Sequence, residues 1–131
     1  MHYTKTDHSI RGSIMFVHSA YLNVYLANGN TDMRKAINGL SLLVEGAMGQ
    51  NPLSGSLFVF CNRKRTIIKL LYWDRNGFCL WQKRLEKARF KWPAIGAKTM
   101  TITTRELMWL IDGLDIMNLN KESRYSYSRT G

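Results

Sequence analysis

Thr66–Leu85, which reads TIIKLLYWDRNGFCLWQKRL, contains two apolar runs separated by a polar turn. The runs Thr66–Trp73 and Phe78–Leu85 are rich in β-branched, aromatic and other apolar residues, a composition that favours strands. Residues 74–77 between them read Asp-Arg-Asn-Gly and contain an Asn-Gly pair, which is typical of tight hairpin turns. The segment therefore predicts an antiparallel hairpin.

The faces of this hairpin do not depend on its register. Pairing Trp73 with Phe78 or with Leu80 differs by two residues, so every side chain keeps its face. One face carries Ile68, Leu70, Tyr72, Cys79 and Trp81, with Lys83 at its end. The other carries Ile67, Lys69, Leu71, Trp73, Phe78, Leu80, Gln82 and Arg84. We expect the first face to be the better core, because it is almost entirely apolar.

Three further segments have strand patterns. Leu57–Cys61 (LFVFC) is apolar on both faces, which predicts a central strand covered on both sides. Tyr21–Ala27 alternates well enough for a first strand and ends at the turn residues 28–30, Asn-Gly-Asn. Thr99–Ile102 follows a glycine-containing loop and predicts a short last strand.

Two segments have helical patterns. After Thr31, which can cap a helix, apolar side chains recur at steps of three and four: Met33, Ile37, Leu40, Val44 and Ala47. Gly49 is expected to end this long helix. Thr103 and Glu106 have the spacing of a capping box, which predicts a short C-terminal helix that ends before Gly113.

These elements predict an α+β fold: a small antiparallel sheet in strand-helix-strand-strand-strand order, with one long helix packed on it. The length of 131 residues and the 45% hydrophobic content suit one domain with one core. We expect a flexible leader over 1–14, a single α+β domain over 15–117 and a flexible tail over 118–131.

Cysteine usage and hydropathy predict a cytoplasmic protein that does not enter membranes. Cys61 and Cys79 lie in apolar runs without metal-ligand spacing, as buried free thiols do. No apolar stretch approaches the roughly 18 residues of a membrane span, and residues 1–13 lack the apolar core of a signal peptide.

Positive charge is concentrated in one part of the chain. There are 19 Lys and Arg residues against 9 Asp and Glu, which gives a net charge of +10. Between Phe60 and Trp92, the acids are Asp74 and Glu86, and ten residues are basic: Arg63, Lys64, Arg65, Lys69, Arg75, Lys83, Arg84, Lys87, Arg89 and Lys91. Most of the excess charge therefore comes from this segment, and excess charge raises affinity for polyanions.

The basic segment predicts contact with nucleic acid. We expect DNA phosphates to bind Arg63, Lys64, Arg65, Lys69, Lys83, Arg84, Lys87, Arg89 and Lys91. From Lys87 to Trp92, basic and apolar residues alternate, which in an extended segment separates a cationic edge from an apolar one. The alternative is a solvated charged surface over a core of Trp73, Trp81, Phe90 and Trp92, since large aromatic residues usually pack inside.

Arg34 and Lys35 fall in the first turn of the predicted long helix, where the helix dipole disfavours cations. An anion at this helix terminus, a DNA phosphate or an acidic patch on a partner, would resolve the conflict. The alternative is that Asp32 and solvent offset the charge.

The residues do not predict an enzyme. The acids Asp32, Glu45, Asp74, Glu86, Glu106 and Asp112 lack the paired spacing with which carboxylates bind catalytic metal ions. His2, His8 and His18 have no metal-ligand partners at a telling distance. We therefore expect no catalytic residue, no metal and no cofactor.

The chain also resembles a known family. Thr31–Pro93 contains TDMRKAINGL, NPLSGSLFVFCNRKR and IIKLLYWDRNGFCLWQKRLEKARFKWP, and ITTRELMWLIDGLD follows at Ile102–Asp115. These stretches are similar in order and spacing to the short accessory protein, called TnpB or the second-reading-frame product, of IS-sixty-six-family insertion sequences. Ala36 and Ala88 stand where that family often has glycine, so local backbone geometry can differ there.

The resemblance implies an accessory role in transposition, with the transposase and a companion accessory protein as partners, and it brings no catalytic residues. Together with the charge, it predicts a non-catalytic factor that contacts DNA. The alternative is an adaptor that binds the transposase or its companions without touching DNA. A homo-oligomer that covers shared apolar surface is compatible with both.

Overall fold

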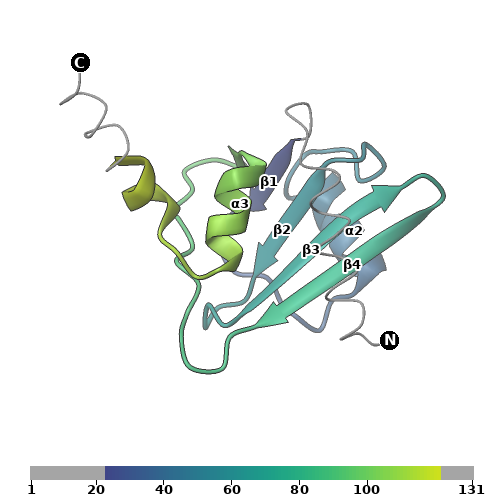
Figure 1. The fold of residues 1–131 in the computed structure, drawn as a ribbon. Coiled ribbons are helices and arrows are strands. Elements are labelled where there is room, and N and C mark those ends of the chain that lie inside the picture. The colour runs from purple at the N-terminus through teal and green to yellow at the C-terminus, as the bar shows by residue number, and fades with distance from the viewer. Residues whose placement is uncertain (1–22, 122–131) are drawn as a thin grey trace, which may run out of the picture.

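The computed structural model describes residues 23–121, in which five strands form one mixed sheet (Figure 1). The strands are β1 (Val24–Ala27), β2 (Leu57–Cys61), β3 (Ile67–Asp74), β4 (Gly77–Arg84) and β5 (Thr99–Ile102). Their spatial order is β4-β3-β2-β1-β5. The α+β class is confirmed.

The sheet is mixed, where the sequence predicted an antiparallel one. β1 and β2 run parallel, with Val24 opposite Leu57, whereas the other three strand pairs are antiparallel. The parallel pair arises because the chain leaves β1, crosses one face as helix α2 and re-enters the sheet beside β1. β5 then adds to the other side of β1.

The hairpin and the central strand follow their predictions. Trp73 pairs with Phe78 and Asp74 with Gly77, so Arg75 and Asn76 form the turn. This register places Ile68, Leu70, Tyr72 and Trp81 in one buried cluster, on the face that was predicted to be the better core. All five residues of β2 are buried, as expected for a strand covered on both sides.

Helix α2 (Ile37–Glu45) covers one face of the sheet, and it is shorter than predicted. Leu40 and Val44 pack with Phe58, Phe60 and Leu71 of the sheet. The helix begins at Ile37 because residues 32–35 form a turn, held by a hydrogen bond from the Arg34 backbone N–H to the Asp32 carboxylate. The backbone N–H of Thr31 binds the Cys61 carbonyl oxygen at 2.9 Å, so this residue fastens the chain to β2 and does not cap the helix.

Helix α3 (Thr104–Ile111) covers the opposite face and begins at the predicted capping box. The Glu106 backbone N–H donates to the Thr103 hydroxyl at 3.0 Å, and the Thr103 backbone N–H donates to the Glu106 carboxylate at 2.8 Å. Leu107, Leu110 and Ile111 are buried against the sheet. Figure 1 shows the sheet between α2 and α3, so the molecule has three layers.

Residues 116–121 are also helical, so this last helix crosses residue 117, the predicted end of the domain. The predicted leader over 1–14 and the tail from 122 onward lie outside the described residues. So do His2, His8 and His18.

Candidate nucleic-acid interface

Three segments that are distant in sequence meet at one end of the sheet. The β2–β3 turn accepts two backbone hydrogen bonds from the chain that follows β4, from Leu85 N–H to the Thr66 oxygen at 2.9 Å and from Phe90 N–H to the Arg65 oxygen at 2.7 Å. The loop after β1 joins them, because Arg65 donates from Nη1 to the Gly29 carbonyl at 3.2 Å. The turn, the segment after β4 and the loop after β1 therefore form one surface.

Six exposed cations lie on the β2–β3 turn, at the last residue of β4 and on the segment after it: Arg63, Lys64, Arg84, Lys87, Arg89 and Lys91. We call these six residues the basic end. Arg84 forms a salt bridge with Glu86 at 3.0 Å, in which both side chains are more than half exposed, so solvent weakens the pairing. Within residues 23–121, the other five cations form no salt bridge. Their charge is available to an external anion.

Arg65 has a structural role at the centre of this surface. Its Nη1 binds the carbonyl oxygens of Gly29 and Asn62, each at 3.2 Å, and its guanidinium lies 5.8 Å from the centre of the Trp92 ring. The Trp92 ring N–H in turn donates to the Ala27 carbonyl at 3.2 Å. Arg65 therefore fixes the three segments relative to one another, and its Nη1 group is bound to carbonyl oxygens of the protein itself.

Lys69 is not on the surface with the other predicted DNA contacts. It is 8% exposed, and its Nζ donates to the carbonyl oxygens of Met33 and Lys35 at 2.8 and 2.9 Å. Burial lowers the pKa of this amine, because the charged form loses hydration. Lys69 holds the turn before α2 on the sheet, and no local sequence pattern predicts these contacts, because the partners lie 36 and 34 residues away.

Lys83 is also used inside the fold. It is half-buried, and its Nζ donates to the Ile111 carbonyl at 3.0 Å, at the C-terminal end of α3. A cation is favourable at this helix terminus, where carbonyl groups lack partners within the helix. Two of the nine predicted DNA contacts, Lys69 and Lys83, therefore bind backbone carbonyls of the protein itself.

Arg34 and Lys35 are exposed but precede α2, so they do not occupy its first turn. The Arg34 guanidinium forms a 2.6 Å salt bridge with Asp32, which holds the pKa of that carboxyl far below its ordinary value. The helix-dipole conflict that suggested an anion site therefore does not arise, because the helix begins at Ile37.

The large aromatic residues of the basic segment are mostly core. Trp81 and Phe90 are each 2% exposed, and Trp92 is held against the loop after β1. Trp73 packs edge-to-face on Phe78, with ring centres 5.0 Å apart, beside the hairpin turn. That turn lies at the end of β3 away from the basic end, so the six cations are not interleaved with exposed aromatic rings.

Neither a metal centre nor a membrane helix is found in the described part of the chain. Between residues 23 and 121, no three His, Cys, Asp or Glu side chains are grouped so that they could hold a metal ion. No helix in the same range has the length and hydropathy to cross a membrane. Cys61 and Cys79 are free, and burial raises the pKa of the Cys61 thiol while the neighbouring Arg65 opposes this shift.

Comparisons with known proteins show which family the chain belongs to. The family described as "IS66 Orf2 like protein" matches residues 22–121. The uncharacterized protein y4hO of Sinorhizobium fredii (strain NBRC 101917 / NGR234) is 38% identical over 94 residues, which cover 72% of this chain and 82% of the relative. The uncharacterized protein y4jC of the same strain is 32% identical over 94 residues, which cover 72% and 80%. No solved structure matches.

The family match spans all five strands and both α2 and α3, and it includes Thr31–Pro93 and Ile102–Asp115, which carry the resemblance seen in the sequence. Members of this family are accessory proteins of insertion sequences, and it is not known as a family of enzymes. The chain therefore belongs to the IS66 Orf2-like family of insertion-sequence accessory proteins.

Proposed function

We propose that this accessory protein serves transposition in the cytoplasm by binding DNA at the basic end, without catalysing strand chemistry. One observation carries the proposal: six exposed cations lie on two segments that backbone hydrogen bonds hold side by side, and one carboxylate is paired among them. A rigid cluster of this kind matches the phosphates of a nucleic-acid backbone.

The proposed contact is electrostatic, and it does not read the sequence of the DNA. Lysine and arginine bound to phosphates position a protein on DNA, whereas sequence is read by groups that reach base edges. Counterion release then makes affinity fall with salt, by a logarithmic slope of about 0.9 for each phosphate neutralised on duplex DNA. The family, which is not known as a family of enzymes, supports the non-catalytic part of the proposal.

A matched pair of variants tests this function. Arg63, Lys64 and Lys87 are replaced together by glutamine to remove three charges from the basic end. The control replaces Arg75, Arg105 and Lys121, which lie elsewhere, and removes the same charge. We expect the first variant to bind DNA more weakly, with a salt slope shallower by about 0.9 for each lost contact. The control should bind almost as wild type does.

Equal losses in the two variants would show that net charge, and not this surface, drives binding. If wild-type protein fails to bind either element-end or random DNA at low salt, while it co-elutes with the transposase, the DNA proposal is wrong. Circular dichroism and thermal melting check that all variants are folded.

A protein-interaction adaptor is the second candidate, because large apolar side chains remain exposed. Leu114 and Met117 beyond α3 are 44% and 54% exposed, and Leu42 on α2 and Leu53 in the α2–β2 loop are 66% and 53% exposed. Apolar surface of this kind often contacts another protein, here the transposase, its companion protein or a second copy of the chain. Replacement of Leu114 and Met117 by serine should then abolish co-elution with the transposase and leave DNA binding unchanged.

A further inference from the structure

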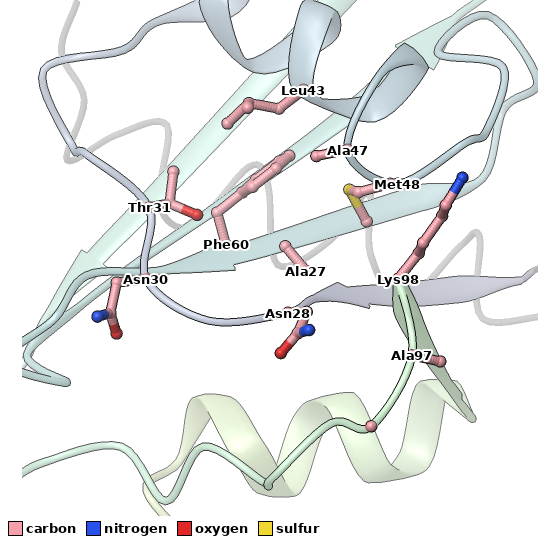
Figure 2. Close-up of a pocket in the computed structure, with 11 residues that line it drawn as sticks. Ala27, Asn28, Asn30, Thr31, Leu43, Ala47, Met48, Phe60, Ala97 and Lys98 are labelled. Atoms are coloured by element: carbon pink, nitrogen blue, oxygen red, sulfur yellow. The ribbon is translucent and has the colours of Figure 1, made fainter.

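A cavity of about 390 Å³ opens on the α2 side of the sheet, between the C-terminal end of α2 and the loop that precedes β5. Its wall is apolar and is formed mainly by Leu43, Ala47, Met48 and Phe60 (Figure 2). The amides of Asn28 and Asn30 point away from this wall, toward α3. The volume lies within the roughly 300–1,000 Å³ range of small-molecule sites. The cavity therefore has room for an aromatic ring with a short substituent.

A buried hydroxyl without a hydrogen-bond partner lies at one end of this cavity. Thr31 is 7% exposed, and Figure 2 shows its hydroxyl oxygen directed toward Phe60, which also lines the cavity. The Thr31 backbone N–H binds the Cys61 carbonyl oxygen, but no group among residues 23–121 forms a hydrogen bond with the hydroxyl. Burial of such a group without a partner costs stability. The hydroxyl is therefore placed to bind a polar atom of a ligand.

The cation Lys98 lies at the other end of the cavity. Figure 2 shows it on the far side of Met48 from Thr31, with its side chain extended toward the segment after α2. There, a Cβ on Gly49 would lie 3.8 Å from the Lys98 Nζ. Within the described part of the chain, Lys98 forms no salt bridge or hydrogen bond. Its ammonium can therefore bind an anion that enters the cavity.

We propose that this cavity binds a small aromatic carboxylate with a hydroxyl group on the far side of its ring. The carboxylate binds Lys98, the ring packs between Met48 and Phe60, and the ring hydroxyl binds Thr31. Thioether sulfur and aromatic rings are both favourable neighbours for an aromatic ligand. The site makes no use of the basic end, so this inference goes beyond the proposed DNA contact and does not depend on it.

Three compounds of one shape test the two ends of the cavity: p-coumarate, cinnamate, which lacks the ring hydroxyl, and cinnamamide, which also lacks the charge. Binding is followed through the backbone amide NMR signals of the full chain. We expect p-coumarate to bind wild type about fivefold more tightly than cinnamate, the size of one net hydrogen bond. Cinnamate should bind about fivefold more tightly than cinnamamide, the size of one exposed ion pair. The shifted signals should include that of Met48.

One variant at each end assigns these two preferences. Thr31→Val should remove the preference for p-coumarate over cinnamate. It should also raise the melting temperature of the free protein, because a methyl group replaces an unpaired buried hydroxyl. Lys98→Gln should remove the preference for cinnamate over cinnamamide. The control, Lys121→Gln, removes the same charge from an exposed residue outside the cavity and should keep both preferences.

Four results would overturn the inference: equal binding of the three compounds to wild type, shifted signals that all lie outside the cavity, loss of the charge preference in Lys121→Gln, or a lower melting temperature for Thr31→Val. The third result would mean that net charge attracts the carboxylate. The fourth would mean that the hydroxyl is bonded inside the fold. None of these results changes the test of DNA binding at the basic end, so the two proposals can fail separately.

Discussion

Two arginines in two turns of the sheet have the same unusual backbone and different surroundings. Arg65 in the β2–β3 turn has a φ of 62°, Arg75 in the β3–β4 turn has a φ of 53°, and the other positive φ angles among the described residues belong to glycines. This conformation costs a residue with a Cβ about 1–2 kcal/mol. Both turns therefore contain backbone strain.

The contacts of the two side chains show that one strained arginine stabilises the fold and the other does not. Arg65 binds two carbonyl oxygens and lies over the Trp92 ring, so the strain is offset by contacts that join three segments. Arg75 is exposed, and within residues 23–121 its side chain forms no hydrogen bond, salt bridge or cation–π contact. The β2–β3 turn is thus part of the tertiary framework, whereas the hairpin turn is a local structure at the far end (Figure 1).

The largest change in the free energy of unfolding is expected at Arg65. Arg65→Ala keeps the strained backbone and removes both hydrogen bonds to carbonyls, so it should lower the free energy of unfolding by about 2–3 kcal/mol. Urea denaturation measures the loss. Arg63→Ala, a neighbouring change at an exposed side chain, should stay within about 0.5 kcal/mol of wild type. Equal stabilities for the two variants would show that the Arg65 contacts are not structural.

Lys69, on β3 between the two turns, should give the next largest effect. Lys69→Met keeps an apolar stem but leaves the carbonyls of Met33 and Lys35 without their donor, which should cost about 1–2 kcal/mol at neutral pH. Urea denaturation of both proteins again measures the difference.

The stability difference between these proteins should also depend on pH. The pKa of Lys69 is lowered in the fold from its ordinary 10.5, so the unfolded chain holds this proton more tightly. Raising the pH toward 10.5 therefore stabilises the wild-type fold relative to the Met variant. A difference that shrinks over this range would contradict the burial of a charged amine.

The smallest change in the free energy of unfolding is expected at Arg75, where the substitution should stabilise the fold. Arg75→Gly relieves the left-handed strain and loses no described contact, although glycine also raises the entropy of the unfolded chain. A net stabilisation of up to about 1 kcal/mol should appear in the melting temperature. Arg75→Ala is the control, because alanine keeps the Cβ and should melt like wild type. Destabilisation by Arg75→Gly would reveal a role for the side chain at the hairpin turn.

Local sequence patterns predicted the elements whose structure is locally determined. The hairpin faces follow from alternation, β2 from its unbroken apolar run, and α3 from the Thr103 and Glu106 capping box. The predicted start of α2 was wrong, because the apolar spacing continues back to Met33. The Asp32 carboxylate accepts from the Arg34 backbone N–H there, and the chain forms a turn instead of a helix. Side-chain bonding to the local backbone competes with helix formation in this way.

The sequence predicted that the candidate site is basic, but it predicted only some of the residues that belong to it. Charge density located the basic end, but it could not separate Lys87 in solvent from Lys69 in the core, because the partners of Lys69 lie 34 and 36 residues away. Such non-local contacts depend on how the sheet is assembled.

The position of β1 between β2 and β5 has a consequence for synthesis of the protein on the ribosome. A nascent chain that has emerged as far as Arg84 contains β1 to β4 and can pair them, but the outer edge of β1 then has no partner. That edge stays open until residues 99–102 emerge and β5 pairs with it. An unpaired strand edge is prone to pair with other chains. A ribosome that pauses between Arg84 and Ile102 therefore prolongs the time during which this edge can pair with another chain.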